Sequence, residues 1–239
     1  MSGIKILIEG DYALFSRPEL KVERVSYDVP TVSALCGLIK SVYWKPAVEY
    51  VIDEIVIFNP IRFINIRRNE CTSVISLRNM QAQMCGEDKS PVIYTSEDRT
   101  QRNSLVLKNV KYGVRFHLSM TGNKSERPDD TVDKHYSILC ERLKKGQWFR
   151  QPCLGCSEFP AKKIELVSEF DYGQISPELR GDRDLGYMVY NLRFADNSKP
   201  VNGDWDKPVF SNRADAAYYH PHIINGVINV EKYREGIVC

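Results

Sequence analysis

The chain has 239 residues, of which 43% are hydrophobic and 27% are charged, and its formal net charge is +2. This balance indicates an ordinary globular protein of one large or two small domains, and it excludes collagen-like and disordered chains. No apolar run approaches the roughly 18 residues of a membrane helix, and the N-terminal apolar stretch is too short for a signal peptide, so we expect a cytoplasmic protein without membrane contact.

The first two thirds of the chain predict strands that alternate with helices. Residues 4–8 read as a buried strand, and a helix is expected from Thr31 to about Tyr43 because Val32, Leu35, Ile39 and Val42 recur at helical spacing. Strands are expected over 50–58 (with a continuation towards Ile66), 105–118 and 163–170, and a second helix over 132–143 with an apolar stripe of Val132, Tyr136, Leu139 and Leu143. The order β-α-β-β-α-β predicts an α+β, ferredoxin-like (RRM-like) domain over residues 1–170.

A basic insertion interrupts this domain over about 67–104. The window from Arg62 to Arg115 holds ten basic and five acidic residues, so it carries +5 while the rest of the chain carries −3. A basic segment in a nearly neutral chain indicates a polyanionic ligand, with a solvated basic loop as the alternative. The stretch is too long for a routine connection, so we expect an extended hairpin or a mobile binding loop.

The last third predicts a second unit. Short strands at 186–194, 208–210 and 223–230 lie among Gly, Asn, Asp and Pro turns. We expect residues 171–239 to form a small antiparallel β-sheet domain.

Three groups of residues could bind a metal, and each has a simpler interpretation. Cys153 and Cys156 form a CxxC, which could be half a zinc site or a redox pair. The second pair that a zinc ribbon needs is absent, so small buried thiols are the alternative. His220 and His222 flank a proline and could share a metal or lie in a polar loop. Asp129, Asp130 and Asp133 could hold a cation, or could stabilise the start of the second helix.

Lys134 and His135 lie off the predicted apolar stripe of the second helix and are therefore available for chemistry. An imidazole can take or give a proton near neutral pH, and an adjacent ammonium can neutralise phosphate charge. Beside a bound phosphodiester, the pair could cleave RNA without a metal ion, with the 2′-hydroxyl as nucleophile. Two exposed polar residues on a surface helix are the alternative.

The SVYWKP segment at 41–46 supplies a second candidate. Tyr43 stands at the predicted helix end, where its phenol could position a 2′-hydroxyl, Lys45 adds charge and Trp44 offers a stacking face. The alternative is that both aromatic residues belong to the core.

Several motifs occur together and in a characteristic order. The chain resembles the type I-C (Dvulg) branch of the fifth CRISPR-associated protein family through GDYALF (10–15), SVYWKP (41–46), VIDEI (51–55), DKHYSIL (133–139), LGCSEFP (154–160) and DLGYMVYNLRF (184–194). The resemblance implies a metal-independent endoribonuclease that cuts CRISPR precursor RNA at the 3′ base of the repeat hairpin. The products implied are a 2′,3′-cyclic phosphate and a 5′-hydroxyl.

The same resemblance implies partners and site residues. The protein is expected to remain on the 5′ handle of the crRNA as a subunit of the type I-C Cascade surveillance complex, beside its backbone and large subunits, with DNA as a possible contact in the assembly. Tyr43, Lys134 and His135 match the family's catalytic residues, and we expect no metal or other cofactor.

The candidate RNA contacts are Lys45 and Trp44, with Arg67, Arg68, Arg99 and Arg102 in the insertion, which can project as a thumb-like hairpin. His117 is not placed in the active site. Two other functions remain open: a non-catalytic subunit that caps the 5′ end of the guide RNA, and a metal-dependent DNA nuclease, for which the sequence offers no convincing carboxylate cluster.

Overall fold

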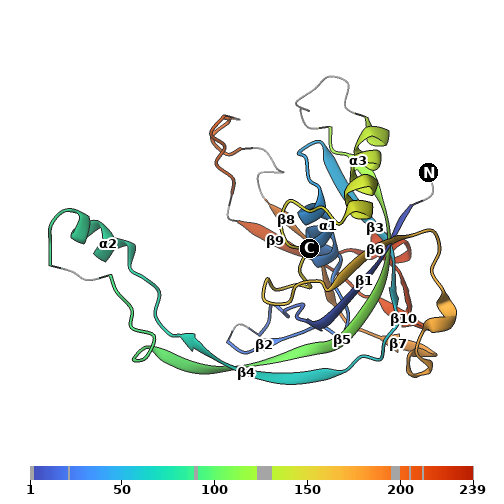
Figure 1. Ribbon diagram of the computed structural model, residues 1–239, viewed down its shortest axis with the longest axis horizontal. Helices are drawn as coiled ribbons and strands as arrows, with labels where there is room; N and C mark the ends of the chain where they lie inside the picture. The colour runs from blue at the N-terminus through green and yellow to red at the C-terminus, as the bar shows by residue number, and fades with distance from the viewer. Residues whose placement is uncertain are drawn as a thin grey trace.

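A nine-stranded sheet forms the centre of the protein (Figure 1). The computed structural model describes residues 3–20, 22–88, 91–122, 131–194, 200–204, 206–211 and 213–238. Within these ranges the strands lie in the order β6-β1-β5-β3-β11-β10-β7, while β2 and β4 pair with β5 off this path. The strands of this sheet are β1 (Ile4–Ala13), β2 (Arg24–Val25), β3 (Val48–Ile57), β4 (Phe63–Cys71), β5 (Arg99–Met120), β6 (Lys163–Val167), β7 (Asp182–Asp184), β10 (His222–Ile224) and β11 (Val227–Asn229).

Four of these strands and two helices follow the predicted β-α-β-β-α-β order. The neighbours β6-β1-β5-β3 are antiparallel throughout. Helix α1 (Val32–Val42) connects β1 with β3, and α3 (Val132–Lys145) connects β5 with β6. Helix α1 packs against β3, α3 packs against β5 and β6, and the two helices touch each other, so both cover the same face of the sheet.

Local signals set the ends of both helices. The side chain of Thr31 accepts a hydrogen bond from the Ala34 N–H, and Thr131 caps α3 in the same way through the Lys134 N–H. Gly146 ends α3 in the left-handed conformation (φ 62°), which glycine adopts without steric cost. The predicted stripe of α1 is confirmed, with Leu38 as a further buried member.

The basic insertion forms a long two-stranded arm. Strand β4 pairs with the first part of β5, from Phe63 opposite Leu107 to Cys71 opposite Arg99. Figure 1 shows the arm extending from the body and ending near α2 (Leu77–Met84), a helix that the sequence analysis did not predict. The hairpin prediction is confirmed, but the continuation of the 50–58 strand to Ile66 is wrong, because β3 ends at Ile57 and β4 is a separate strand.

The last third of the chain contributes to two sheets, and the prediction of one appended sheet is partly wrong. Strands β8 (Met188–Phe194) and β9 (Ala214–Tyr219) form the small two-stranded sheet. The strand predicted over 223–230 is instead two short strands, β10 and β11, and β11 joins the main sheet beside β3. Residues 208–210 form no strand. Three 3-10 turns complete the described chain: η1 (Tyr172–Gln174), η2 (Pro177–Leu179) and η3 (Val230–Gly236).

The main core lies between the sheet and the two helices. Strands β1, β3 and β5 contribute fully buried Ile6, Ile52 and Phe116, and α1 and α3 contribute Leu35 and Leu139. Across the described residues, no helix is both long enough and apolar enough to cross a membrane.

Candidate functional site

Tyr43 lies at the end of α1 and points into the protein. Its backbone is extended (φ −151°), and its N–H closes the last turn of α1 by donating to the Ile39 carbonyl. Because successive side chains of an extended segment point to opposite sides, Tyr43 is turned inward and Trp44 outward. Their exposed fractions are 5% and 52%, respectively.

His135 meets Tyr43 from the first turn of α3. The Tyr43 Oη lies 2.7 Å from the His135 Nδ1, within hydrogen-bond distance, and the two ring centroids are 5.8 Å apart. The contact joins residues 92 positions apart and brings two of the characteristic motifs together.

The predicted apolar stripe of α3 is correct at Leu139 and Leu143 but wrong at Tyr136. His135 is 1% exposed and belongs to the buried side with Leu139 and Leu143, whereas Tyr136 is 38% exposed. A buried imidazole is costly unless it is hydrogen-bonded, and Tyr43 supplies such a bond. Hydrophobic periodicity assigned His135 to the surface. Its polar partner at the end of α1 allows it to lie on the buried face of α3 instead.

Two residues that the sequence analysis missed hold Tyr43 in place. The Arg142 guanidinium lies 5.1 Å from the centre of the Tyr43 ring, and its Nη1 donates to the Val42 carbonyl at the end of α1. The Tyr50 hydroxyl donates to the Tyr43 carbonyl at 2.7 Å. Burial raises the pKa of Tyr50, so this donor keeps its proton. Arg142 follows His135 by seven residues, which is two helical turns. This spacing puts both side chains on the same side of α3 and was the signal in the sequence that could have identified Arg142.

The remaining predicted residues of this site lie nearer the surface. Lys134 precedes His135 on α3 and is partly exposed, as is Lys45, which follows Trp44. The structure thus arranges a buried Tyr-His pair beside a partly exposed lysine. Asp133 lies in the first turn of α3, where an acidic residue suits the helix dipole, while Asp129 and Asp130 lie outside the described residues.

The Tyr43–His135 contact limits the proton chemistry of the imidazole. If Oη donates to Nδ1, the neutral ring carries its proton on Nε2 and can give it up there. If Nδ1 donates to Oη, Nε2 holds a lone pair and can accept a proton. In either case Tyr43 fixes the tautomer and the ring orientation.

The four arginines predicted to bind RNA lie on opposite faces of the arm. Arg68 is directly opposite Arg102, while Arg67 and Arg99 lie on the other face, opposite Asn103 and Cys71. Both Arg67 and Arg99 are exposed.

Arg68 already has protein partners. Its guanidinium forms an ion pair with Glu158 and donates to the Ser104 hydroxyl at 2.8 Å. Arg24 pairs with the same Glu158 and with Glu70, both at 3.3 Å. These contacts attach the base of the arm to the body, so the exposed Arg67 and Arg99 are better placed than Arg68 for a ligand.

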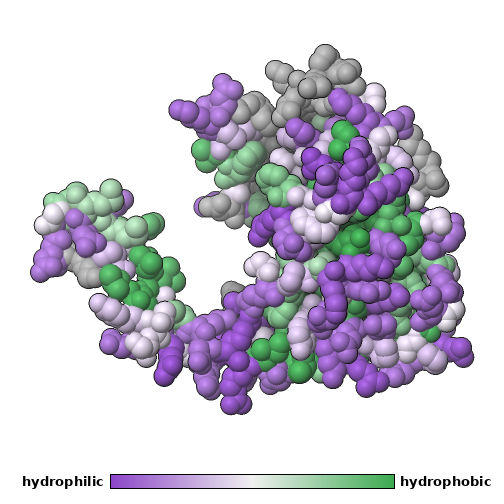
Figure 2. Space-filling view, viewed as in Figure 1, coloured by the Kyte–Doolittle hydropathy of each residue, from purple (hydrophilic) through white to green (hydrophobic). Residues whose placement is uncertain are grey.

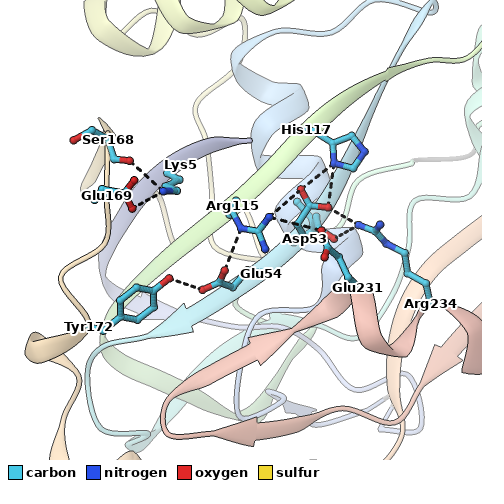
Figure 3. A network of polar contacts seen from close by, with 11 residues as sticks. Lys5, Asp53, Glu54, Arg115, His117, Ser168, Glu169, Tyr172, Glu231 and Arg234 are labelled. Carbon is cyan, nitrogen blue, oxygen red and sulfur yellow. Dashed lines mark hydrogen bonds and ion pairs between the residues drawn. The ribbon is translucent and has the colours of Figure 1, made fainter. Parts of the chain in front are cut away.

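A charged network around Asp53 joins the C-terminal turn to the sheet (Figure 3). The register of β3 against β5 shifts between Ile52 and Glu54, and the Asp53 side chain at this irregularity is 3% exposed. Its carboxylate contacts the Arg234 Nη2 at 2.6 Å and the His117 Nδ1 at 2.9 Å. The VIDEI motif therefore has a structural explanation: the buried carboxylate of its Asp53 holds His117 and Arg234 in place.

A neighbouring branch of the network centres on Glu54. The Arg115 Nε donates to it at 3.1 Å and the Tyr172 hydroxyl at 2.8 Å, as Figure 3 also shows. Burial and the Glu54 carboxylate raise the pKa of Tyr172 to about 12. The positive charges of this network face carboxylates, which favours a structural role for it.

The Cys153–Cys156 segment packs against the end of β1. The Leu14 N–H donates to the Leu154 carbonyl at 3.0 Å, and both cysteines are free and partly buried. Burial raises the pKa of Cys153, which disfavours the thiolate that redox chemistry and metal binding require. Among the described residues, the cysteines belong to no group of three potential metal ligands; the group that does form is Asp184, His220 and His222.

The chain is similar to known proteins along nearly its whole length. The Cas5d model of the family described as CRISPR-associated protein (Cas_Cas5) matches residues 3–231. A protein of Mannheimia succiniciproducens named CRISPR pre-crRNA endoribonuclease Cas5d is 41% identical over 219 residues, which cover 87% of this chain and 95% of that protein. A protein of the same name from Thermus thermophilus is 33% identical over 240 residues, covering 98% and 95%.

Solved structures support the fold. One described as a CRISPR-associated protein has a TM-score of 0.60 at 21% identity, covering 95% of this chain and 90% of that one. A functionally uncharacterized protein from Streptococcus mutans has a TM-score of 0.60 at 25% identity, covering 94% and 90%. Since the family model spans residues 3–231 and both named relatives align over 95% of their length, the chain belongs to the Cas5d family of CRISPR-associated proteins.

Proposed function

We propose that this chain is a pre-crRNA endoribonuclease that cuts the CRISPR repeat RNA at the 3′ base of its hairpin without a metal ion. Two relatives of 41% and 33% identity carry the name of that activity. The observation that carries the proposal is the 2.7 Å contact between the Tyr43 Oη and the His135 Nδ1, with Lys134 next in the chain. The β6-β1-β5-β3 core, which we assign to the ferredoxin-like class, holds the two helices that bear these residues.

In the proposed reaction the 2′-oxygen attacks the adjacent phosphorus and the bond from phosphorus to the 5′-oxygen breaks. The 2′-hydroxyl loses its proton to a base and the leaving 5′-oxygen gains one, which gives a 2′,3′-cyclic phosphate and a 5′-hydroxyl. His135 performs one of these transfers through Nε2, and Tyr43 orients its ring through Nδ1. The Lys134 ammonium stabilises the charge that gathers on the phosphorane.

The RNA is proposed to reach this site along the arm. Figure 2 shows an open hollow between the tip of the arm and the body, and exposed Arg67 and Arg99 lie on the arm. Trp44 is exposed beside Tyr43 and offers a face on which a base can stack. After the cut, the protein stays on the 5′ handle as a subunit of the surveillance complex, next to its backbone and large subunits.

The burial of the Tyr-His pair favours a second candidate function. His135 is 1% exposed and Tyr43 is 5% exposed, so RNA must shift the surrounding residues before Nε2 can reach a phosphodiester. A protein in which this pair only holds α1 against α3 would bind the 5′ handle without cutting it. The two functions differ in whether His135 is needed for cleavage or for stability alone.

The test is a single-turnover cleavage assay with the repeat RNA of the same CRISPR locus, in EDTA. A matched RNA carries a 2′-deoxy nucleotide on the 5′ side of the expected cut. We expect one cut at the stem base that is absent from the deoxy RNA. His135→Asn, whose amide can still meet Tyr43, should slow the cut roughly 10²-fold or more and leave RNA affinity nearly unchanged, because phosphate contacts supply most of the affinity.

Lys144→Ala is the control for a substitution on α3 away from the candidate site, since Lys144 is exposed in the last turn of the helix. It should cleave at the rate of the unmodified protein. Tight binding of the repeat RNA without a cut would reject the nuclease and leave the capping subunit. A cut that disappears in EDTA would instead point to a metal-dependent nuclease.

A further inference from the structure

Two short strands at the end of the main sheet bring together four side chains that are suited to metal binding. Strands β7 and β10 are antiparallel, with His222 opposite Asp184. Because side chains two residues apart in a strand share a face, Asp182, Asp184 and His222 point the same way. His220 precedes His222 by two residues and contacts the same Asp184.

Three donor atoms converge at this point. The His220 Nε2 lies 2.6 Å from the Asp184 Oδ1, and the His222 Nε2 lies 4.0 Å from the same oxygen. One ligand atom from each of the three residues lies within 4.8 Å of the other two. Around a tetrahedral zinc ion, whose bonds are about 2.0–2.2 Å, ligand atoms lie roughly 3.3 Å apart. Shifts of about 1 Å, within the range of side-chain rotation, would bring these donors to that spacing.

Outer contacts already orient each of these ligands. The His222 Nδ1 lies 2.7 Å from the Asp182 Oδ1, so a proton held between them leaves the lone pair on Nε2, the atom nearer Asp184. The Gly186 N–H donates to the Asp184 Oδ1 at 2.7 Å, and the Tyr187 ring stacks on His220 with a centroid distance of 5.0 Å. A carboxylate behind a histidine ligand is the usual support of a protein metal site.

The donor set selects among metals. Two imidazole nitrogens with one carboxylate oxygen suit Zn²⁺ and its neighbours, whereas Mg²⁺ and Ca²⁺ prefer oxygen donors alone. The side chains of His220 and Asp184 are 43% and 55% exposed, so the remaining coordination position is open to water. None of these residues belongs to the Tyr43–His135 pair, which lies on α1 and α3.

We propose that Asp184, His220 and His222 bind one Zn²⁺ ion, with Asp182 as the positioning carboxylate and water in the open position. The ion would join strand β7 to the segment that follows β9, two parts of the chain that lie 36 residues apart at Asp184 and His220.

The test is a Zn²⁺ titration of the full chain by calorimetry after removal of metals with EDTA and dialysis. We expect one equivalent to bind and to raise the melting temperature. His220→Gln and Asp184→Asn should each abolish the saturable binding, and Asp182→Asn should weaken it about 10- to 100-fold while the melting temperature in EDTA stays unchanged.

Cys153→Ser/Cys156→Ser is the matched control, because a CxxC is the main competing zinc ligand in this chain. It should bind Zn²⁺ as the unmodified protein does. A Co²⁺-loaded sample should also lack the near-ultraviolet charge-transfer band of thiolate ligands, and this readout needs no variant to fold. Absence of zinc binding, binding that survives His220→Gln, or binding that the cysteine variant loses would each overturn the proposal.

Discussion

Tyr43→Phe tests the contact on which the proposed active site depends. The substitution keeps the ring and its packing against Arg142 and removes only the hydroxyl, which lies 2.7 Å from the His135 Nδ1. Both residues are at most 5% exposed, so water does not readily replace the lost partner. A buried polar group deprived of its hydrogen bond costs about 1–3 kcal/mol. In a chain of this size each kcal/mol lowers the melting temperature by about 2–4 °C, so we expect a fall of about 2–12 °C.

The same variant should also cut RNA more slowly, because its imidazole has lost the group that fixes its tautomer. A double-mutant cycle with His135→Ala, which removes the imidazole that meets the Tyr43 hydroxyl, separates the two effects: the coupling energy in unfolding should be about 0.5–3 kcal/mol. Tyr12→Phe is the control, since Tyr12 is 40% exposed. It should change the free energy of unfolding by less than about 0.5 kcal/mol. If Tyr43→Phe melts and cleaves like the unmodified protein, the contact neither stabilises the fold nor orients His135.

Three further predictions concern the rest of the fold. Asp53→Ala removes the buried partner of Arg234 and should destabilise the protein by about 3 kcal/mol, which is at the low end for a broken buried ion pair because the arginine reaches solvent. Urea unfolding measures this loss. A loss below about 1 kcal/mol would show that the network is dispensable for stability. Burial raises the pKa of Cys36 to about 11, so at pH 8 only about one thiol in a thousand is ionised. Iodoacetamide with mass spectrometry should therefore label exposed Cys71 first and reach Cys36 only near pH 11 or after unfolding; equal rates at pH 8 would contradict this. Gly155→Ala would place a methyl group 1.9 Å from the Leu14 carbonyl oxygen, at a position where φ is +87°. Circular dichroism should therefore show a melting temperature that is lower by several degrees. An unchanged melting temperature would refute the close approach.

The sequence predicted the core of the fold because its signals are local. Thr31 and Thr131 cap the two helices, and β1, β3 and β5 carry many buried aliphatic residues. What it missed depends on contacts across long separations. Strand β11 joins β3 through pairs such as Val227 with Val56, and no local pattern distinguishes that partner from a strand in a separate small sheet.

The candidate site shows the same division. Its residue types were recognisable, but the burial of His135 was not, because hydrophobic periodicity assigns a histidine to the surface unless its partner is known. The burial of Asp53 was not predictable for a related reason, because its partners His117 and Arg234 lie on β5 and on the C-terminal turn, far away in the sequence. The third ligand of the proposed zinc site, Asp184, lies 36 residues before His220, too far for a spacing pattern to connect them.

The length of β5 has a consequence for how this family can vary. Its 22 residues pair with β4 from Arg99 to Leu107, with β1 from Leu107 to Phe116 and with β3 from Tyr112 to Met120. One residue inserted in the middle of this strand would turn every later side chain to the opposite face. The segment between Cys71 and Arg99 carries no such constraint, because it only closes the arm. Changes in chain length among homologues should therefore accumulate there, and an engineer could exchange residues 72–98 for a shorter or longer tip while the anchoring strand keeps its register.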